Sequence, residues 1–367
     1  MIPFMRLDRQ FQSIRGEVMR SVERVFSSGA VLQSREVASF EEKIANLTGT
    51  KFAVAVNSGT DALIFALKGL GLPPKSRVGV TSMSFIASVS AIIHAGLQPV
   101  FFDVNPHTML MDSDSVVESI AKDELDAVLL VHLYGQSIDF ENIVELAAEK
   151  GIPIIEDCAQ SIGASRFGKP LGGNGVASCL SFDPTKVIGA YGSGGAIATN
   201  DLSFAEVMRA FRYHGHVGGQ KYESAGFNSQ MDSVQAAILN VKLNYLEQWQ
   251  DRRRDISARY QIALTQSGIR PISVLDGNIH NNHKYVLQVE SREKFRAHLE
   301  KFGVQTKIQY PFPLHRQPLF GLSGISLPDV EYASQHILSL PMYAELKDEE
   351  VSLICEAVKS GSDIYAQ

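Results

Sequence analysis

A single lysine, Lys186, stands in a stretch of the chain that could carry nucleophilic chemistry. The stretch from Ser178 to Asn200 begins with a short apolar run that ends at Asp183-Pro184, and after Lys186 come glycines and a second apolar run. A lysine shielded from water has a lowered pKa, so its amine can attack carbonyl groups and form a Schiff base. The alternative is a lysine that only extends its ammonium group from a strand end into water. Other residues must decide between the two.

The segment Asn57–Leu63, with the sequence NSGTDAL, follows a short apolar run and opens a predicted helix. Ser58 can cap that helix, and Gly59 lets an anion approach the backbone. The amides of the first helical turn and the Thr60 hydroxyl then form a cradle suited to phosphate. A plain helix cap without a ligand is the alternative for this segment.

Two further positions carry side chains suited to a flat cofactor ring. Phe85, in the sequence TSMSFIAS, could stack on such a ring, or it could be an ordinary core phenylalanine. Glu156 and Asp157 end an apolar strand-like run, where buried carboxylates are costly unless they are paired. Asp157 could keep a pyridine nitrogen protonated, and the alternative for it is a helix cap.

Ser181 adds a hydroxyl that can reach a phosphate while the Lys186 amine reaches an aldehyde. A phosphate cradle, a stacking ring, an acid for a pyridine nitrogen and a Schiff-base lysine together describe one cofactor, pyridoxal 5'-phosphate (PLP). The four stretches are expected to converge, because ligands of doubly wound sheets bind beyond the carboxyl ends of the strands.

The elements that must position these residues alternate between strand and helix. Near-continuous runs of Val, Ile, Ala and Phe, separated by helical segments, predict an α/β fold with a mostly parallel sheet covered on both faces. Two helices precede the sheet, over 7–26 and 36–47, with Ser27-Ser28-Gly29 as a stop between them. Strands are predicted over 52–56, 78–81, 99–104, 127–133, 152–156 and on both sides of Lys186, and helices over 58–70, 85–95, 115–121 and 140–150.

The pattern changes after the sheet. Asn228–Trp249 reads as one long amphipathic helix, with Ser229 and Asp232 in capping-box positions. The charge-rich sequence WQDRRRDISARY that follows predicts a solvated helix face.

Beyond Ser267 the elements are fewer and shorter, which predicts a smaller α+β unit. It has a strand over 285–289, a helix over 292–302, a strand near Thr306 and a last helix over 349–359. We therefore divide the chain into two domains. These are a large PLP-binding domain over residues 1–250, which includes the N-terminal helical segment, and a small C-terminal α+β domain over residues 251–367.

Composition narrows the class of protein. Of the 367 residues, 45% are hydrophobic and 20% charged, as in globular enzymes, and the net charge of −6 argues against broad binding of nucleic acid or anionic membranes. The three cysteines are scattered without C-x-x-C spacing, so they predict neither a zinc site nor a disulfide framework. With no signal peptide and no membrane-spanning run, a cytoplasmic protein without a metal site is expected.

The chain resembles the DegT/DnrJ/EryC1/StrS family of sugar aminotransferases along nearly its whole length. The resemblance is carried, in order, by NSGTDAL, SFIAS, EDCAQSIGA, SFDPTK with YGSGGAIATND, RAFRYHG and GFNSQMDSVQAAIL. It implies the PLP-dependent transferase fold type I, with a mostly parallel seven-stranded sheet in the large domain. The sequences YPFPLHRQPLF and ILSLPMYAEL resemble the subgroup that aminates C3 of nucleotide-linked keto sugars.

The resemblance also implies roles for particular residues. Lys186 would bond to the cofactor aldehyde, and Asp157 would pair with the ring nitrogen. Around them, Gln160 would contact the ring hydroxyl and Phe85 would stack on the ring. Gly59, Thr60 and Ser181 would hold the phosphate, joined by Asn228 of the partner subunit in a homodimer. The residues that match substrate-lining stretches are His214, Lys221, Tyr222, Tyr310 and His315.

Two positions depart from the family pattern and bear on the substrate. Relatives often have arginine at the position of Gln230, and tyrosine or phenylalanine at the position of Asp183. The first change removes a fixed positive charge, and the second places a carboxyl beside the sugar pocket. A lysine at position 186 argues against the sugar 3-dehydratases of the family, which have histidine there.

The implied activity is transfer of an amino group from an amino acid, L-glutamate by resemblance, to a nucleotide-linked keto-deoxy sugar for amino-sugar biosynthesis. One alternative is an aminotransferase for a free cyclitol or a sugar phosphate. Another is a catalytically silent regulator that keeps the fold, which intact Lys186, Asp157 and Ser181 argue against. A nicotinamide dehydrogenase is disfavoured because no glycine fingerprint follows the first strand-like run.

Overall fold

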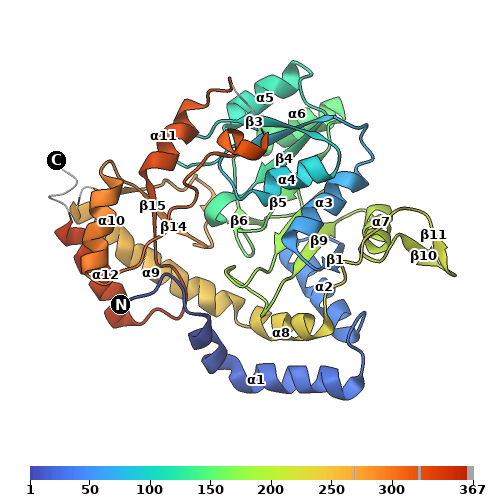
Figure 1. Ribbon diagram of the computed structural model, residues 1–367, viewed down its shortest axis with the longest axis horizontal. Coiled ribbons are helices and arrows are strands. Elements are labelled where there is room, and N and C mark those ends of the chain that lie inside the picture. The colour runs from blue at the N-terminus through green and yellow to red at the C-terminus, as the bar shows by residue number, and fades with distance from the viewer. Residues whose placement is uncertain (268, 321–323, 362–367) are drawn as a thin grey trace.

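The computed structural model describes residues 1–267, 269–320 and 324–361 (Figure 1). Its centre is a seven-stranded sheet with the strand order β1-β9-β8-β5-β4-β2-β3. Strand β9 runs antiparallel to both of its neighbours, whereas β8, β5, β4, β2 and β3 pair in parallel. The predicted mostly parallel α/β sheet is therefore confirmed. The strands are β1 (Phe52–Val56), β2 (Arg77–Thr81), β3 (Gln98–Phe102), β4 (Ala127–Val131), β5 (Ile154–Asp157), β8 (Ala177–Ser181) and β9 (Gly195–Thr199).

Helices cover both faces of this sheet, because its strands carry apolar side chains on both sides. On β5, Ile154 belongs to one hydrophobic cluster and Ile155 to another, as alternation along a strand requires. The first cluster includes residues of α2 (Arg35–Thr48), α5 (Ser113–Ala121), α6 (Glu141–Lys150) and α8 (Ser233–Leu243). The second includes residues of α3 (Gly59–Gly69), α4 (Ala87–His94) and α7 (Leu202–Arg212).

A third hydrophobic cluster lies under a smaller sheet near the C-terminus. The sheet has the order β12-β14-β15, with β12 (Arg270–Pro271), β14 (Tyr285–Gln288) and β15 (Ile337–Leu340). Around it pack α9 (Leu246–Ser267), α10 (Arg292–Lys301) and α12 (Asp348–Ser360), which lie together at one end of the molecule (Figure 1). The division into domains at residues 250 and 251 stays a prediction.

The remaining elements are short or lie at the margins of the two sheets. Helix α1 (Leu7–Ser28) packs against α8 along the lower edge of Figure 1 and ends at Gly29, which has a left-handed backbone. The others are β6 (Ser165–Arg166), β7 (Lys169–Pro170), β10 (His216–Gly218), β11 (Lys221–Tyr222), β13 (Asn278–Ile279), α11 (Pro328–His336) and the 3₁₀ turns Leu133–Gly135, Leu314–Arg316 and Pro318–Phe320. Among the described residues, no helix is long and apolar enough to span a membrane.

The predicted long helix over Asn228–Trp249 is wrong at its start and in its middle. Helix α8 begins only at Ser233, and a turn at Asn244 and Tyr245 separates it from α9. Ser229 does not cap the helix, because its hydroxyl donates to Asp61 at the first turn of α3. A tertiary contact therefore displaced the predicted capping box.

Two further predictions in the C-terminal half are corrected. The segment WQDRRRDISARY lies on α9, but it is not simply a solvated face, because Arg253, Ile256 and Tyr260 are buried. Near Thr306 the structure has no strand element, only single bridges such as the one that joins Lys307 to Ser339. Helices α7 and α11 and strand β15 were not predicted.

Candidate active site

A pocket of about 440 Å³ lies where β5 and β8 end and α3 begins. This is the carboxyl edge of parallel strands, the position at which doubly wound sheets bind ligands. The pocket brings together eight of the predicted site residues: Gly59, Thr60, Phe85, Asp157, Gln160, Ser181, Lys186 and Tyr310. The four predicted stretches, and Tyr310 as a fifth, therefore converge on one cavity although they are far apart in sequence.

Lys186 reaches the pocket from the loop that follows β8. Its backbone amide donates to the carbonyl of Asp183 at 2.9 Å, which closes a tight turn after the strand. Within the described residues, its Nζ has no hydrogen-bond or ion-pair partner. Burial lowers the pKa of Lys186, although the charges of Asp157 and Asp183 oppose the shift. A larger fraction of neutral amine is available for nucleophilic or base chemistry as a result.

Asp157 is the last residue of β5 and its side chain is only 4% exposed. Its carboxylate accepts hydrogen bonds from the Ser88 hydroxyl at 2.7 Å and from the Ala159 amide at 3.1 Å. Burial nevertheless raises the pKa of Asp157 above its usual range. No helix begins after this residue, so the alternative of a helix cap does not apply. Asp157 is a buried acid that faces the pocket with room for a cationic partner.

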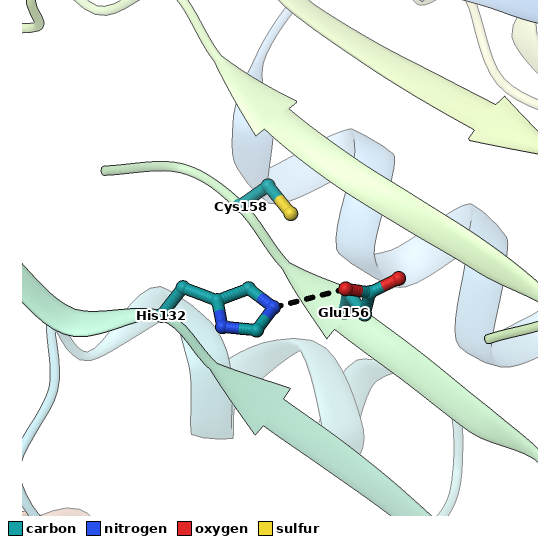
Figure 2. A group of neighbouring side chains, drawn as sticks. All are labelled: His132, Glu156 and Cys158. Carbon is teal, nitrogen blue, oxygen red and sulfur yellow. Dashed lines mark hydrogen bonds and ion pairs between the residues drawn. The ribbon is translucent and has the colours of Figure 1, made fainter. Parts of the chain in front are cut away.

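Glu156, the preceding residue, points to the other side of the strand and belongs to a closed polar group (Figure 2). Its carboxylate accepts hydrogen bonds from His132 Nε2 at 3.0 Å and from the Asn174 amide at 2.7 Å, and further bonds from Gly172 and the Asn174 side chain. Burial alone would raise the pKa of Glu156, but these hydrogen bonds lower it.

Cys158 lies beside this pair, and one ligand atom from each of the three residues falls within 4.8 Å of the others (Figure 2). Burial raises the pKa of the Cys158 thiol well above its usual range, which leaves it as a neutral thiol. The Glu156 carboxylate is already satisfied by hydrogen bonds. We therefore interpret the group as structural support that holds β5, and with it Asp157, against the loop at Gly172–Asn174.

The first turn of α3 forms a tight cradle against the ends of β8 and β9. Ser58 caps the helix, since its hydroxyl accepts from the Asp61 amide at 3.0 Å. A Cβ on Gly59 would lie 2.6 Å from the Ser181 Cβ, and one on Gly195 would lie 2.2 Å from the Ser58 carbonyl oxygen. Only glycine permits this approach. The first amides of a helix lack partners within the helix, so this wall of the pocket suits an anion.

Two aromatic residues and an amide complete the pocket. Gln160 accepts from the Tyr134 amide at 2.9 Å and donates to the Tyr310 hydroxyl at 3.1 Å, which fixes its orientation. Phe85 is 55% exposed and lies 6.4 Å, ring to ring, from Tyr310. Phe85 is therefore not a core residue, and its ring is free to contact a ligand.

Five predicted residues lie outside the lining of this pocket. Asn228 is exposed beside Tyr213, and Lys221 and Tyr222 are exposed on β11. His214 is also exposed, with a positive φ, next to the ring of Tyr213. His315 is fully buried and bonded through its ring to Ser82 and Glu331. Their roles stay predictions.

The pocket also contains residues that the sequence did not single out, notably Ser88, His283 and Lys284. The last two come from the start of β14, in the C-terminal part of the chain. Two adjacent basic residues directly before an apolar strand were a visible signal for them. Asp183, which was noted for its departure from the family pattern, lines the pocket as well.

The chain matches proteins whose functions are described. The model of the DegT/DnrJ/EryC1/StrS aminotransferase family matches residues 12–359. The chain is 37% identical to a "Pleiotropic regulatory protein" of Geobacillus stearothermophilus, over 97% of each chain. It is 34% identical to the UDP-2-acetamido-2-deoxy-3-oxo-D-glucuronate aminotransferase of Pseudomonas aeruginosa, over 98% of this chain and 99% of the relative. Among solved structures, NtdA of Bacillus subtilis with bound cofactor PMP superposes with a TM-score of 0.91 at 30% identity, covering 99% of this chain and 85% of that one.

Proposed function

The chain belongs to the DegT/DnrJ/EryC1/StrS aminotransferase family, and from this premise we propose that it transfers an amino group from L-glutamate to C3 of a nucleotide-linked keto sugar, with PLP as cofactor. The observation that carries the proposal is the convergence of Lys186 and Asp157 on one pocket, the lysine with a lowered pKa. The name of the Pseudomonas relative, a 3-oxo sugar aminotransferase, supports the choice of substrate.

The donor set of the pocket fits PLP, and it offers partners for each part of that cofactor. Gly59 and Thr60 at the first turn of α3, with Ser181 at the end of β8, would hold the phosphate. Asp157 would pair with the ring nitrogen and Gln160 with the ring hydroxyl, while Phe85 would cover the ring. When bound, PLP would supply an aldehyde that accepts the amino group and a protonated ring that takes up electrons.

In this scheme the residues of the chain position groups and move protons. Lys186 Nζ would hold the cofactor between turnovers, and once displaced by the donor it would take the proton from the donor's α-carbon. The charge of Asp157 would keep the ring nitrogen protonated, and the contact would in turn stabilise the ionised carboxylate. The same Lys186 amine would return a proton at the sugar carbon in the second half of the reaction.

We further place the enzyme in the cytoplasm as a homodimer in which Asn228 completes the phosphate site of the partner. The exposure of Asn228 outside the pocket of its own chain supports this arrangement. Mixing the variants Lys186→Ala and Asn228→Ala tests it, because shared sites would restore part of the activity that each variant lacks alone. Mixed dimers without any recovery would argue against shared sites.

The decisive experiment concerns Lys186. The Lys186→Ala variant should lose at least about 10³-fold in turnover, since it lacks both nucleophile and base. After borohydride reduction of wild-type protein with PLP, mass spectrometry should find the cofactor on the peptide that contains Lys186. The variant Lys169→Ala, at an exposed lysine on β7, serves as the matched control and should behave like wild type. Failure of the wild-type protein to bind PLP at all would refute the proposal.

Two other functions can be separated from this one. An aminotransferase for a free cyclitol or a sugar phosphate would not bind nucleoside diphosphates, which calorimetry measures directly. The regulatory name of the Geobacillus relative favours a second candidate, a protein that keeps the fold without catalysis. Conversion of glutamate to 2-oxoglutarate by the PLP-loaded protein would exclude that candidate.

A further inference from the structure

Lys284 is a charged side chain without a charged partner in the wall of the active-site pocket. It lies directly before β14, is 6% exposed, and lines the pocket. Within the described residues its Nζ makes no hydrogen bond and no ion pair. Its near neighbour is the ring of Phe4, whose centre lies 5.3 Å away. A buried ammonium group with only an aromatic contact is costly, because the ring replaces little of the lost hydration.

The charges around Lys284 make the site still less suited to a cation and better suited to an anion. Arg253, Lys186 and Lys307 all lie close enough to lower the pKa of Lys284, and Asp183 opposes them. Together with burial, which is the largest cause, they bring the pKa of Lys284 to about 7. Arg253, Lys186 and Lys307 thus add positive charge to this side of the pocket.

Lys284 also stands apart from the residues suited to hold the cofactor phosphate. Those residues belong to α3 and to β8 of the seven-stranded sheet, whereas Lys284 lies directly before β14 of the smaller sheet. We therefore expect the anion that binds Lys284 to be a group of the substrate. An amino-acid donor carries a carboxylate on the very carbon that Lys186 must deprotonate, so a carboxylate necessarily enters this pocket.

We propose that Lys284 is the binding group for a substrate carboxylate in the active-site pocket. The carboxylate could come from the amino-acid donor or from an acidic keto sugar, and both present the same chemistry to an ammonium group. The inference rests on the proposed function, because it takes the occupant of the pocket to be a substrate of an aminotransferase.

The first test measures binding without turnover. Glutarate has two carboxylates and no amino group, so calorimetry with the PLP-loaded protein reports carboxylate binding alone. We expect Lys284→Met to weaken glutarate binding at least tenfold. Lys169→Met, which removes an exposed ammonium group on β7 outside the lining of the pocket, is the control and should stay within about twofold of wild type. Equal glutarate affinity in wild type and Lys284→Met would overturn the proposal.

The dependence of binding on pH distinguishes a direct role from a structural one. Glutarate stays ionised between pH 6 and 9, while Lys284 loses its proton as the pH rises through about 7. Wild-type affinity should therefore fall over this range, and the part due to Lys284 should be absent in Lys284→Met. Lys186 and His283 also face Lys284, but both are present in wild type and in the variant. Their contributions to the pH profile therefore cancel when the two proteins are compared. An unchanged pH profile in the variant would count against the proposal.

Steady-state measurements of KM for the donor and for the keto sugar distinguish the two sources of the carboxylate. A donor carboxylate predicts a higher KM for glutamate in Lys284→Met, with the KM for a neutral keto sugar unchanged. A sugar carboxylate predicts a higher KM for a 3-oxo uronate sugar alone. No change in either KM overturns the assignment.

Failure of the proposed function gives a separate result. Suppose that the wild-type protein transaminates no substrate while Lys284→Met still abolishes glutarate binding. That result would refute the aminotransferase activity and support the carboxylate site. Thermal unfolding checks that the variant is folded. Removal of the buried charge should leave the melting temperature unchanged or raise it, whereas a lower melting temperature with intact glutarate binding would assign Lys284 a structural role instead.

Discussion

The two acidic residues that end β5 have opposite environments on opposite faces of one strand. Glu156 faces a closed group in which His132, Gly172 and Asn174 satisfy its oxygens, and its pKa is lowered. Asp157 faces the pocket with two hydrogen-bond donors, and its pKa is raised. Both are buried, so burial alone does not distinguish a structural carboxylate from a functional one.

The difference lies in whether each carboxylate is satisfied by the protein itself. A carboxylate whose partners are all present stabilises the fold, and one that lacks a partner is prepared for a ligand. Lys284 also differs from Arg253, which is buried as well but whose Nη1 donates to the carbonyls of Asn282 and Met342, although its Nε has no partner among the described residues. Four predictions follow from the contrast between Glu156 and Asp157.

Asp157→Asn should have the largest effect, and it should fall on activity. The amide keeps the shape of the side chain but carries no negative charge to stabilise a protonated ring nitrogen, so turnover should fall about 10²–10³-fold. The melting temperature should not fall, because the substitution removes a buried charge whose pKa is raised by burial. Steady-state kinetics and thermal unfolding together check this prediction, and a large loss of stability with normal turnover would reverse the assignment of the two faces.

Glu156→Ala should act on stability instead. It leaves the buried donors of His132 and Asn174 unpaired, which should lower the free energy of unfolding by about 3 kcal/mol. Urea denaturation measures the loss. Turnover per folded molecule should remain within about tenfold of wild type, since the side chain points away from the pocket. A double-mutant cycle with His132→Ala should show strong coupling between the pair.

Ser88→Ala should have a smaller effect on stability and should change the environment of Asp157 but not that of Glu156. It removes the 2.7 Å hydrogen bond to Asp157 and should cost about 1 kcal/mol of stability. The pKa of Asp157 should then rise further, because one donor that favours its ionised form is lost. A titration of Asp157 by carbon-13 NMR in cofactor-free protein would detect the shift, and an unchanged titration would show that Ser88 does not tune this acid.

The two acids should contribute to the pH dependence of folding stability with opposite signs. The lowered pKa of Glu156 gives stability that is present at neutral pH and is lost as the pH falls through the folded-state pKa. The raised pKa of Asp157 instead costs stability above its folded-state pKa, and the cost disappears in acid.

In cofactor-free protein, Asp157→Asn should therefore be more stable than wild type at pH 7, by a margin that shrinks toward pH 4. Glu156→Gln should be less stable than wild type at pH 7, and this deficit should also shrink in acid. Denaturant unfolding at several pH values measures both differences. Margins of the same sign for the two variants would contradict the contrast.

Periodicity and chain order predicted the large sheet well, because strands buried on both faces read as continuous apolar runs. Phe52–Val56 is predicted and observed with the same bounds. The long helix over Asn228–Trp249 failed because its start depends on a contact with Asp61, which lies far away in sequence. Local spacing holds no information about such a contact.

The site residues likewise divide into those that local sequence predicts and those that depend on long-range packing. Lys186, Asp157 and Gly59 were predicted to lie together because each stands close to the end of a recognisable strand, and all three line one pocket, while their roles stay predictions. Lys284 was missed although it stands beside His283 directly before an apolar strand, and its lack of a polar partner among the described residues appears only in the packed structure. His315 lies outside the pocket lining for the converse reason, since Ser82 and Glu331 engage its ring in the interior.

The bond from Ser229 to Asp61 has a consequence beyond the helix boundary that it moves. The Ser229 carbonyl also accepts from the Asn57 amide at 3.1 Å, so the residue next to Asn228 is fastened on both sides of the α3 cap. While both hydrogen bonds hold, any displacement of the α3 cap by a bound cofactor would displace position 228 as well. In a dimer whose subunits exchange Asn228, cofactor binding at one active site would therefore change the geometry of the other active site.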